Sequence, residues 1–273
     1  MPVLSEGGWN IDYEETGMGS PVILIHSSVS GNQQWRSLTE ALKDRYRVLA
    51  INLFGYGDTT PWPENTVQTL ADHADLVLAL CSISGDQLHM VGHSYGGAVA
   101  LKAALRLGQK IAGLVLLEPN PFYLLSQHKR KTAYEEAKTL RDHVKKYGAA
   151  GDWYKVAQRF ADYWVGDGTW DSMSQKRRSA FLEAIPPNFY EWDGVMNETT
   201  TIDTWAALTE KTLVVYAADT KRPIREIVEL FVEACPHWMF KEIPEGGHMA
   251  PLFQPNIVNP IIREFLDSIE ASS

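Results

Sequence analysis

Residues 88–100 read LHMVGHSYGGAVA, an apolar strand that passes through Gly92-His93-Ser94-Tyr95-Gly96 into a helix of small residues. Strand, sharp turn and helix in this order are the context in which a G-x-S-x-G motif forms a nucleophile elbow. The two glycines remove side chains that would collide where the strand and the helix meet. The alternative is a glycine-rich turn with an incidental serine, but these flanks favour a catalytic Ser94. We interpret the neighbouring His93 as structural.

The composition indicates a globular protein without a nucleic-acid partner. The 273 residues are 45% hydrophobic and 22% charged, which suits one large core or two small ones. The formal charge of −9 leaves no basic excess to neutralise phosphates, and it also disfavours polyanionic substrates. Cys81 and Cys235 lack the spacing of a metal site, and no H-E-x-x-H motif is present. We therefore expect neither a metal nor another cofactor.

The sequence also predicts a cytoplasmic protein. Its first residues contain no basic region followed by an apolar core, and no apolar run approaches membrane-spanning length. Two cysteines are too few for a disulfide framework, which fits a reduced compartment. We expect a small-molecule substrate and no membrane partner, and the oligomeric state is left open.

Apolar runs that alternate with helical periodicity predict an α/β fold. β-Branched runs such as residues 22–25 are typical of strands buried on both faces of a parallel sheet. Helices predicted between such runs imply a mostly parallel central sheet with helices on both faces. Residues 9–16 alternate apolar and polar side chains, which predicts a half-buried edge strand. Further strands are expected at 47–52, 88–91, 111–117, 212–216 and 238–243, and helices at 32–43, 66–81, 223–234 and 256–270.

This alternation stops in the middle of the chain. Residues 122–200 contain no strand-like run, and their helical stretches are rich in aromatic side chains. We therefore divide the sequence into a core formed by residues 1–121 and 201–273 and a helical insertion at 122–200.

Four motifs together resemble the α/β-hydrolase superfamily over nearly the whole chain. They are Ile25-His26 at the end of the first buried strand, Gly55-Tyr56-Gly57 in a loop, the G-x-S-x-G turn, and GGHMAP at residues 246–251. The resemblance implies the α/β-hydrolase fold, with the insertion as a helical cap (lid) over the active site. It also implies the chain order nucleophile, acid, histidine.

A serine hydroxyl needs a base to take its proton as it attacks, and the resemblance places this base at His248. An imidazole titrates near neutral pH, so it can act first as base and then as acid. Two carboxylates compete for the role of orienting the histidine. Asp219 follows the late strand after which most of the superfamily keeps its acid, and Glu118 follows strand 111–117, the position that some members use. We favour Glu118 because Ala217-Ala218 replaces the usual glycine of the late loop.

The resemblance further implies an oxyanion hole made of two backbone N–H groups, those of Tyr95 and Ser28. The usual His-Gly pair of the superfamily is His26-Ser27 in this chain. A backbone donor survives that change, and we interpret His26 as structural.

These features predict a serine hydrolase that cleaves a carboxylic ester of an apolar or aromatic group through an acyl-enzyme intermediate. The aromatic insertion favours such a group, because ligand pockets are mostly apolar with few polar anchors. In the superfamily that this chain resembles, haloalkane dehalogenases and epoxide hydrolases use an aspartate as the nucleophile. A serine at position 94 therefore argues against both activities. A lactonase or a carbon–carbon bond hydrolase would use the same residues, and a triad-retaining ligand receptor is the alternative from another class.

Overall fold

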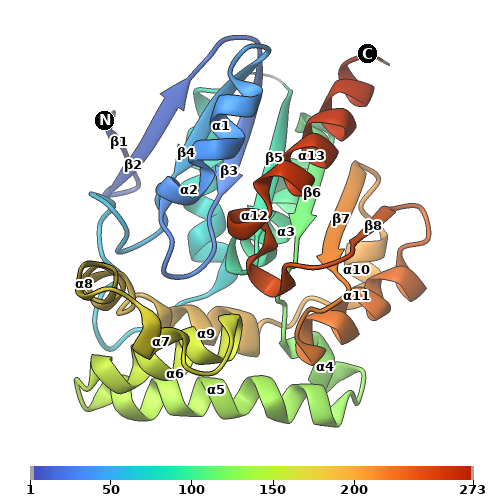
Figure 1. Ribbon diagram of the computed structural model, residues 1–273. Helices are drawn as coiled ribbons and strands as arrows, with labels where there is room; N and C mark the ends of the chain where they lie inside the picture. Colours follow the sequence, from blue (N-terminus) through green and yellow to red (C-terminus); the bar gives the residue numbers. More distant parts are fainter. Residues whose placement is uncertain (1–2, 86, 272–273) are drawn as a thin grey trace.

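The computed structural model describes residues 3–85 and 87–271. One eight-stranded sheet runs through the molecule in the order β1-β2-β4-β3-β5-β6-β7-β8 (Figure 1). Neighbours from β4 to β8 pair parallel, whereas β2 pairs antiparallel with both β1 and β4. The predicted mostly parallel α/β fold is therefore confirmed. The strands are β1 (Val3–Glu6), β2 (Trp9–Thr16), β3 (Ser20–Ile25), β4 (Tyr46–Ile51), β5 (Leu88–His93), β6 (Ile111–Leu117), β7 (Lys211–Ala217) and β8 (Met239–Ile243).

Two details differ from the sequence prediction. Residues 9–16 form a strand but not an edge strand, because β1 pairs along its outer side with Leu4 opposite Ile11. β1 has only four residues, most of them exposed, so it gives no periodic signal. The helix expected at 66–81 begins at Leu70, because Thr69 caps it in a reciprocal pair of hydrogen bonds with Asp72.

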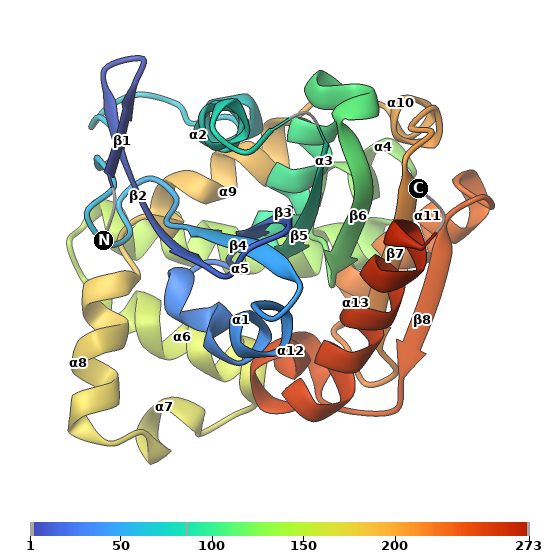
Figure 2. The same cartoon turned by 90° about the horizontal axis from the view of Figure 1, so that it is seen from above.

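Helices cover both faces of the sheet (Figure 2). One face carries α1 (Arg36–Leu42) and α13 (Pro255–Glu270), whose apolar side chains join those of β3 and β4 in one core cluster. The other face carries α2 (Leu70–Ser82), α3 (Tyr95–Leu107) and α11 (Arg222–Ala234). No helix of the described residues is long and apolar enough to cross a membrane. The short elements η1 (Asn32–Trp35), η2 (Gly108–Lys110), η3 (Gly247–Met249) and α12 (Ala250–Phe253) lie in the connections.

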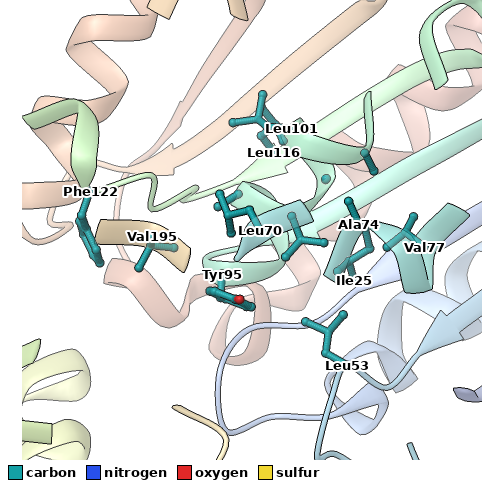
Figure 3. Packing of buried hydrophobic residues seen from close by; sticks show 14 of the residues in the cluster. Ile25, Leu53, Leu70, Ala74, Val77, Tyr95, Leu101, Leu116, Phe122 and Val195 are labelled. Carbon is teal, nitrogen blue, oxygen red and sulfur yellow. The ribbon is translucent and has the colours of Figure 1, made fainter. Parts of the chain in front are cut away.

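A helical insert lies between β6 and β7, and Figure 1 shows most of it along one end of the sheet. Its buried side chains belong to the same apolar cluster as those of α2 and α3. Figure 3 shows this continuity, with Val195 of the insert close to Tyr95 at the start of α3. The insert comprises α4 (Tyr123–Gln127), α5 (Lys131–Ala149), α6 (Trp153–Val165), α7 (Thr169–Ser172), α8 (Gln175–Ala184), α9 (Asn188–Asn197) and α10 (Ile202–Ala206).

Strand register brings five loops to this end of the sheet. Ile25 pairs with Gly92, His93 with Leu117, Leu117 with Val215, and Ala217 with Ile243. The loops that follow β3, β5, β6, β7 and β8 therefore open side by side beneath the insert. Ligands in open α/β sheets bind at such carboxyl ends of the strands.

Candidate active site

Ser94 stands at a strained turn between β5 and α3. Its backbone has φ 54° and ψ −116°, a region that residues with a Cβ rarely adopt. A Cβ at Gly92 would lie 2.3 Å from the carbonyl oxygen of Gly96, and a Cβ at Gly96 would lie 2.2 Å from that of Ile25. Both positions thus exclude any side chain, and α3 can start directly against the ends of β3 and β5.

Three side chains predicted as a triad lie in hydrogen-bond contact. The Ser94 Oγ is 2.8 Å from Nε2 of His248, and Nδ1 of His248 is 3.2 Å from Oε2 of Glu118. Relative exposure is 4%, 3% and 2% for Ser94, His248 and Glu118, so bulk water is nearly excluded from all three. With the imidazole proton on Nδ1, Nε2 can accept the Ser94 proton and Glu118 can accept from Nδ1.

Glu118 follows β6 in a conformation that fixes its carboxylate. Its φ is 48°, and its backbone N–H donates to the Val215 carbonyl at 2.9 Å. Oε1 accepts from the Ala217 N–H at 2.6 Å, and Oε2 accepts from the Thr220 hydroxyl as well as from His248. Burial raises the pKa of Glu118, and the donors from Thr220 and Ala217 oppose that rise.

Asp219, the other acid considered, has a different set of partners. Its carboxylate accepts from the backbone N–H of Gly247 at 2.8 Å and from that of Gly246 at 3.3 Å. These two glycines lead directly into His248. Asp219 is exposed and, among the described residues, makes no hydrogen bond to the imidazole. Asp219 therefore holds the loop of residues 244–249 that carries His248, the histidine loop, and does not contact the imidazole ring.

The His248 ring lies between the core and the helical insert. Trp164 of α6 stacks on it with ring centroids 4.0 Å apart and planes inclined by 28°. Burial lowers the pKa of His248, which favours the neutral form of the ring at neutral pH. His93 donates from Nε2 to the backbone carbonyl of His248 at 2.8 Å, and its side chain therefore supports the loop.

The loop after β3 carries the Ser28 N–H, one of the two donors predicted for the oxyanion hole. The Ser27 N–H donates to Gln34 Oε1 at 3.0 Å, and the Val29 N–H donates to the Tyr56 hydroxyl at 2.9 Å. Within the described chain the Ser28 N–H between them has no protein acceptor. The Tyr95 N–H, at the first position of α3, likewise has no acceptor within its own helix.

A buried carboxylate of the insert, Glu191 on α9, joins this loop to the insert. It accepts from the Ser28 hydroxyl, from the Tyr56 hydroxyl at 2.9 Å and from Asn188 Nδ2 at 3.1 Å. Burial raises the pKa of Glu191. The sequence prediction missed this contact, because 163 residues separate Glu191 from Ser28 along the chain and no motif connects them.

Above Ser94 lies a cavity of about 450 Å³. Its walls come from the loop after β3, the elbow, the helices of the insert and the histidine loop. The described residues contain no cluster of His, Cys, Asp or Glu suited to a metal ion. Most of the cavity lining is apolar, and this part consists of Val29, Phe122, Phe160, Ala161, Trp164, Val165, Met173, Ala180, Phe181, Ala184, Trp192, Val195, Met249, Leu252 and Phe253.

A sequence model described as the alpha/beta hydrolase family matches residues 22–260. The chain belongs to the alpha/beta hydrolase family. One curated relative is the 2-hydroxy-6-oxo-6-(2'-aminophenyl)hexa-2,4-dienoic acid hydrolase of Metapseudomonas resinovorans. It is 32% identical over 118 residues, which are 42% of this chain and 40% of the relative. This alpha/beta hydrolase chain thus spans less than half the length of the curated relatives it matches first.

Solved structures resemble this alpha/beta hydrolase over nearly its whole length. A thermophilic esterase from Thermogutta terrifontis is 25% identical with a TM-score of 0.76, and the match covers 98% of this chain and 97% of the other. MGS-M2, an alpha/beta hydrolase from a Medee basin deep-sea metagenome library, reaches a TM-score of 0.81 at 15% identity, with 97% of each chain covered. The second likeness shows the shared fold alone.

Proposed function

We propose that this protein is a serine hydrolase that cleaves a carboxylic ester of an apolar or aromatic group through an acyl-enzyme intermediate. One observation carries the proposal. The hydrogen-bonded series Glu118, His248 and Ser94, with contacts of 3.2 and 2.8 Å, ends at a largely apolar cavity of about 450 Å³. A nucleophile, its base and the group that orients the base are the parts that acyl transfer requires.

The proposed reaction uses each of these groups in turn. His248 Nε2 takes the Ser94 proton as Oγ attacks the ester carbonyl, and Glu118 stabilises the imidazolium through Nδ1. The N–H groups of Tyr95 and Ser28 donate to the oxygen that becomes negative. His248 then protonates the leaving alcohol, and a water molecule activated by the same nitrogen releases the acyl group.

The lining of the cavity supports an ester with an apolar acyl or alcohol group. Aromatic and aliphatic side chains of the insert form most of the apolar part of its wall, so an apolar acyl or alcohol group gains by leaving water. The helical insert acts in this proposal as the lid over the site. The similarity to the Thermogutta terrifontis esterase supports the same class of substrate.

A carbon–carbon bond hydrolase is the second candidate. It is favoured by the aligned segment shared with the Metapseudomonas resinovorans dienoic acid hydrolase at 32% identity. The same serine and histidine would serve, so the substrate range decides between the two.

The test is hydrolysis of p-nitrophenyl esters of increasing acyl length by the wild type and by Ser94→Ala. We expect turnover in the wild type and a loss on the order of 10⁴-fold in the variant. The dependence on acyl length reports the depth of the cavity. If the wild type hydrolyses no ester although a fluorophosphonate labels Ser94, the ester proposal is wrong and carbon–carbon or lactone substrates are tested next.

A further inference from the structure

Asn120 makes a contact with the nucleophile that the proposed triad does not use. It lies two residues after Glu118, and its Nδ2 is 3.3 Å from Ser94 Oγ. The side chain is 6% exposed and forms part of the cavity wall. The backbone carbonyl of Asn120 accepts from the Phe122 N–H at 2.7 Å, which fixes the turn after β6. One short segment thus supplies both the carboxylate against His248 and an amide against Ser94.

The direction of this hydrogen bond follows from the proton count at Ser94. The hydroxyl has a single proton, and His248 Nε2 at 2.8 Å accepts it. Any second partner of Oγ must therefore donate, so the amide of Asn120 has to present Nδ2–H to the serine. The Oδ1 atom of the same amide is buried and has no protein partner among the described residues.

We propose that Asn120 is a catalytic residue that assists deacylation by holding the Ser94 oxygen as it departs. This inference rests on the proposed acyl-enzyme chemistry. In deacylation, water forms a bond to the acyl carbon and gives a proton to His248. The bond from that carbon to Ser94 Oγ breaks, and His248 returns the proton to Oγ. Negative charge therefore grows on the oxygen that Nδ2–H contacts.

The same hydrogen bond helps the two half-reactions unequally. An ester oxygen is a weaker acceptor than a hydroxyl or an alkoxide, so the bond strengthens while Oγ leaves and weakens while Oγ attacks. Only interactions that are stronger in the transition state accelerate a step. Asn120 therefore speeds deacylation and gives acylation little or no help.

The experiment separates the two steps by rapid mixing of the protein with p-nitrophenyl butyrate. The burst of nitrophenol measures acylation, the steady rate measures deacylation, and intact-protein mass measures the acyl-enzyme. For Asn120→Leu, which keeps the size of the side chain and removes the donor, we expect deacylation to fall about tenfold relative to acylation. This is less than the loss of an oxyanion-hole donor, because 3.3 Å is a long hydrogen bond. In Asn120→Asp the ionised carboxylate can only accept hydrogen bonds and offers no donor to Ser94 Oγ. This variant should therefore also accumulate the acyl-enzyme.

Asn259→Leu is the matched control. Asn259 is also a buried asparagine that donates to a serine hydroxyl, Ser37 Oγ at 3.0 Å, but it lies on α13 away from the cavity. The Asn259→Leu substitution should lower the melting temperature and leave the ratio of the deacylation rate to the acylation rate unchanged. If Asn120→Leu slows both steps equally or neither, the inference is wrong and the ester proposal stands. If the wild type forms no acyl-enzyme, the proposed function fails and the inference with it.

Discussion

Replacement of Glu118 by glutamine tests the proposed acid most directly. The carboxylate receives three donors, the Ala217 N–H on Oε1 and the Thr220 hydroxyl and His248 Nδ1 on Oε2. In Glu118→Gln the oxygen of the amide stays with the Ala217 N–H, because that donor cannot turn away. The amide NH₂ then faces His248 Nδ1.

This arrangement reverses the tautomer of the histidine. An N–H opposite Nδ1 requires Nδ1 to accept, so the ring proton moves to Nε2, which can no longer take the Ser94 proton. Such a reversal costs on the order of 10⁴ in kcat in serine triads. That factor corresponds to about 5.5 kcal/mol of transition-state stabilisation. We expect a loss of about 10³- to 10⁴-fold with the melting temperature nearly unchanged.

The control for this variant is Asp219→Asn. In the wild type the Gly247 N–H donates to the Asp219 carboxylate at 2.8 Å. An asparagine at this position retains an oxygen for that donor, so the histidine loop keeps its main support. We expect a loss of less than about tenfold. The assay is kcat for p-nitrophenyl butyrate together with the rate of fluorophosphonate labelling at Ser94. If Asp219→Asn is the crippling change and Glu118→Gln is mild, the assignment of Glu118 is refuted.

Two further predictions concern pKa values set by burial. Trp164→Ala uncovers the His248 ring, so the lowered pKa of His248 should rise toward 6.5 and the acid limb of the labelling rate should move to higher pH; an unchanged limb would contradict this. For Glu191, whose pKa burial raises above the unfolded value of about 4.3, the wild type loses stability as the pH rises through the folded pKa. The melting temperature of Glu191→Gln relative to wild type should therefore increase as the pH rises above the unfolded value of about 4.3. A difference that is constant with pH would show that Glu191 is not linked to stability in this way.

Much of the fold could be predicted from local patterns. β-Branched runs predict the parallel strands because both faces of these strands are buried. The short exposed strand β1 could not be found in this way, since its partner β2 defines it more than its own four residues do. The start of α2 depended on a side-chain cap at Thr69, which a periodicity argument places only to within a few residues.

The site was predictable where a motif fixes the backbone, and less so where tertiary contacts decide. The turn around Ser94 is set by glycines whose missing side chains the sequence displays directly. Glu118 and Asp219 both follow predicted strands, and only the strand register places the first against His248. Trp164 and Glu191 reach the site from the insert, whose helices carry no sequence signal for what they face.

The position of the proposed acid on β6 has a consequence for how such a protein can diverge. Neighbouring parallel strands lie about 4.8 Å apart, so the ends of β6 and β7 are both within reach of one histidine loop. In this chain Glu118, which follows β6, is the proposed acid. Asp219, which follows β7, accepts hydrogen bonds from the backbone N–H groups of Gly246 and Gly247. Under the proposed mechanism, a substitution at Asp219 therefore changes the rigidity of this loop and leaves the contact between Glu118 and His248 in place. A comparison that looks for an acid only after β7 would therefore overlook Glu118, the carboxylate that contacts His248 in this chain.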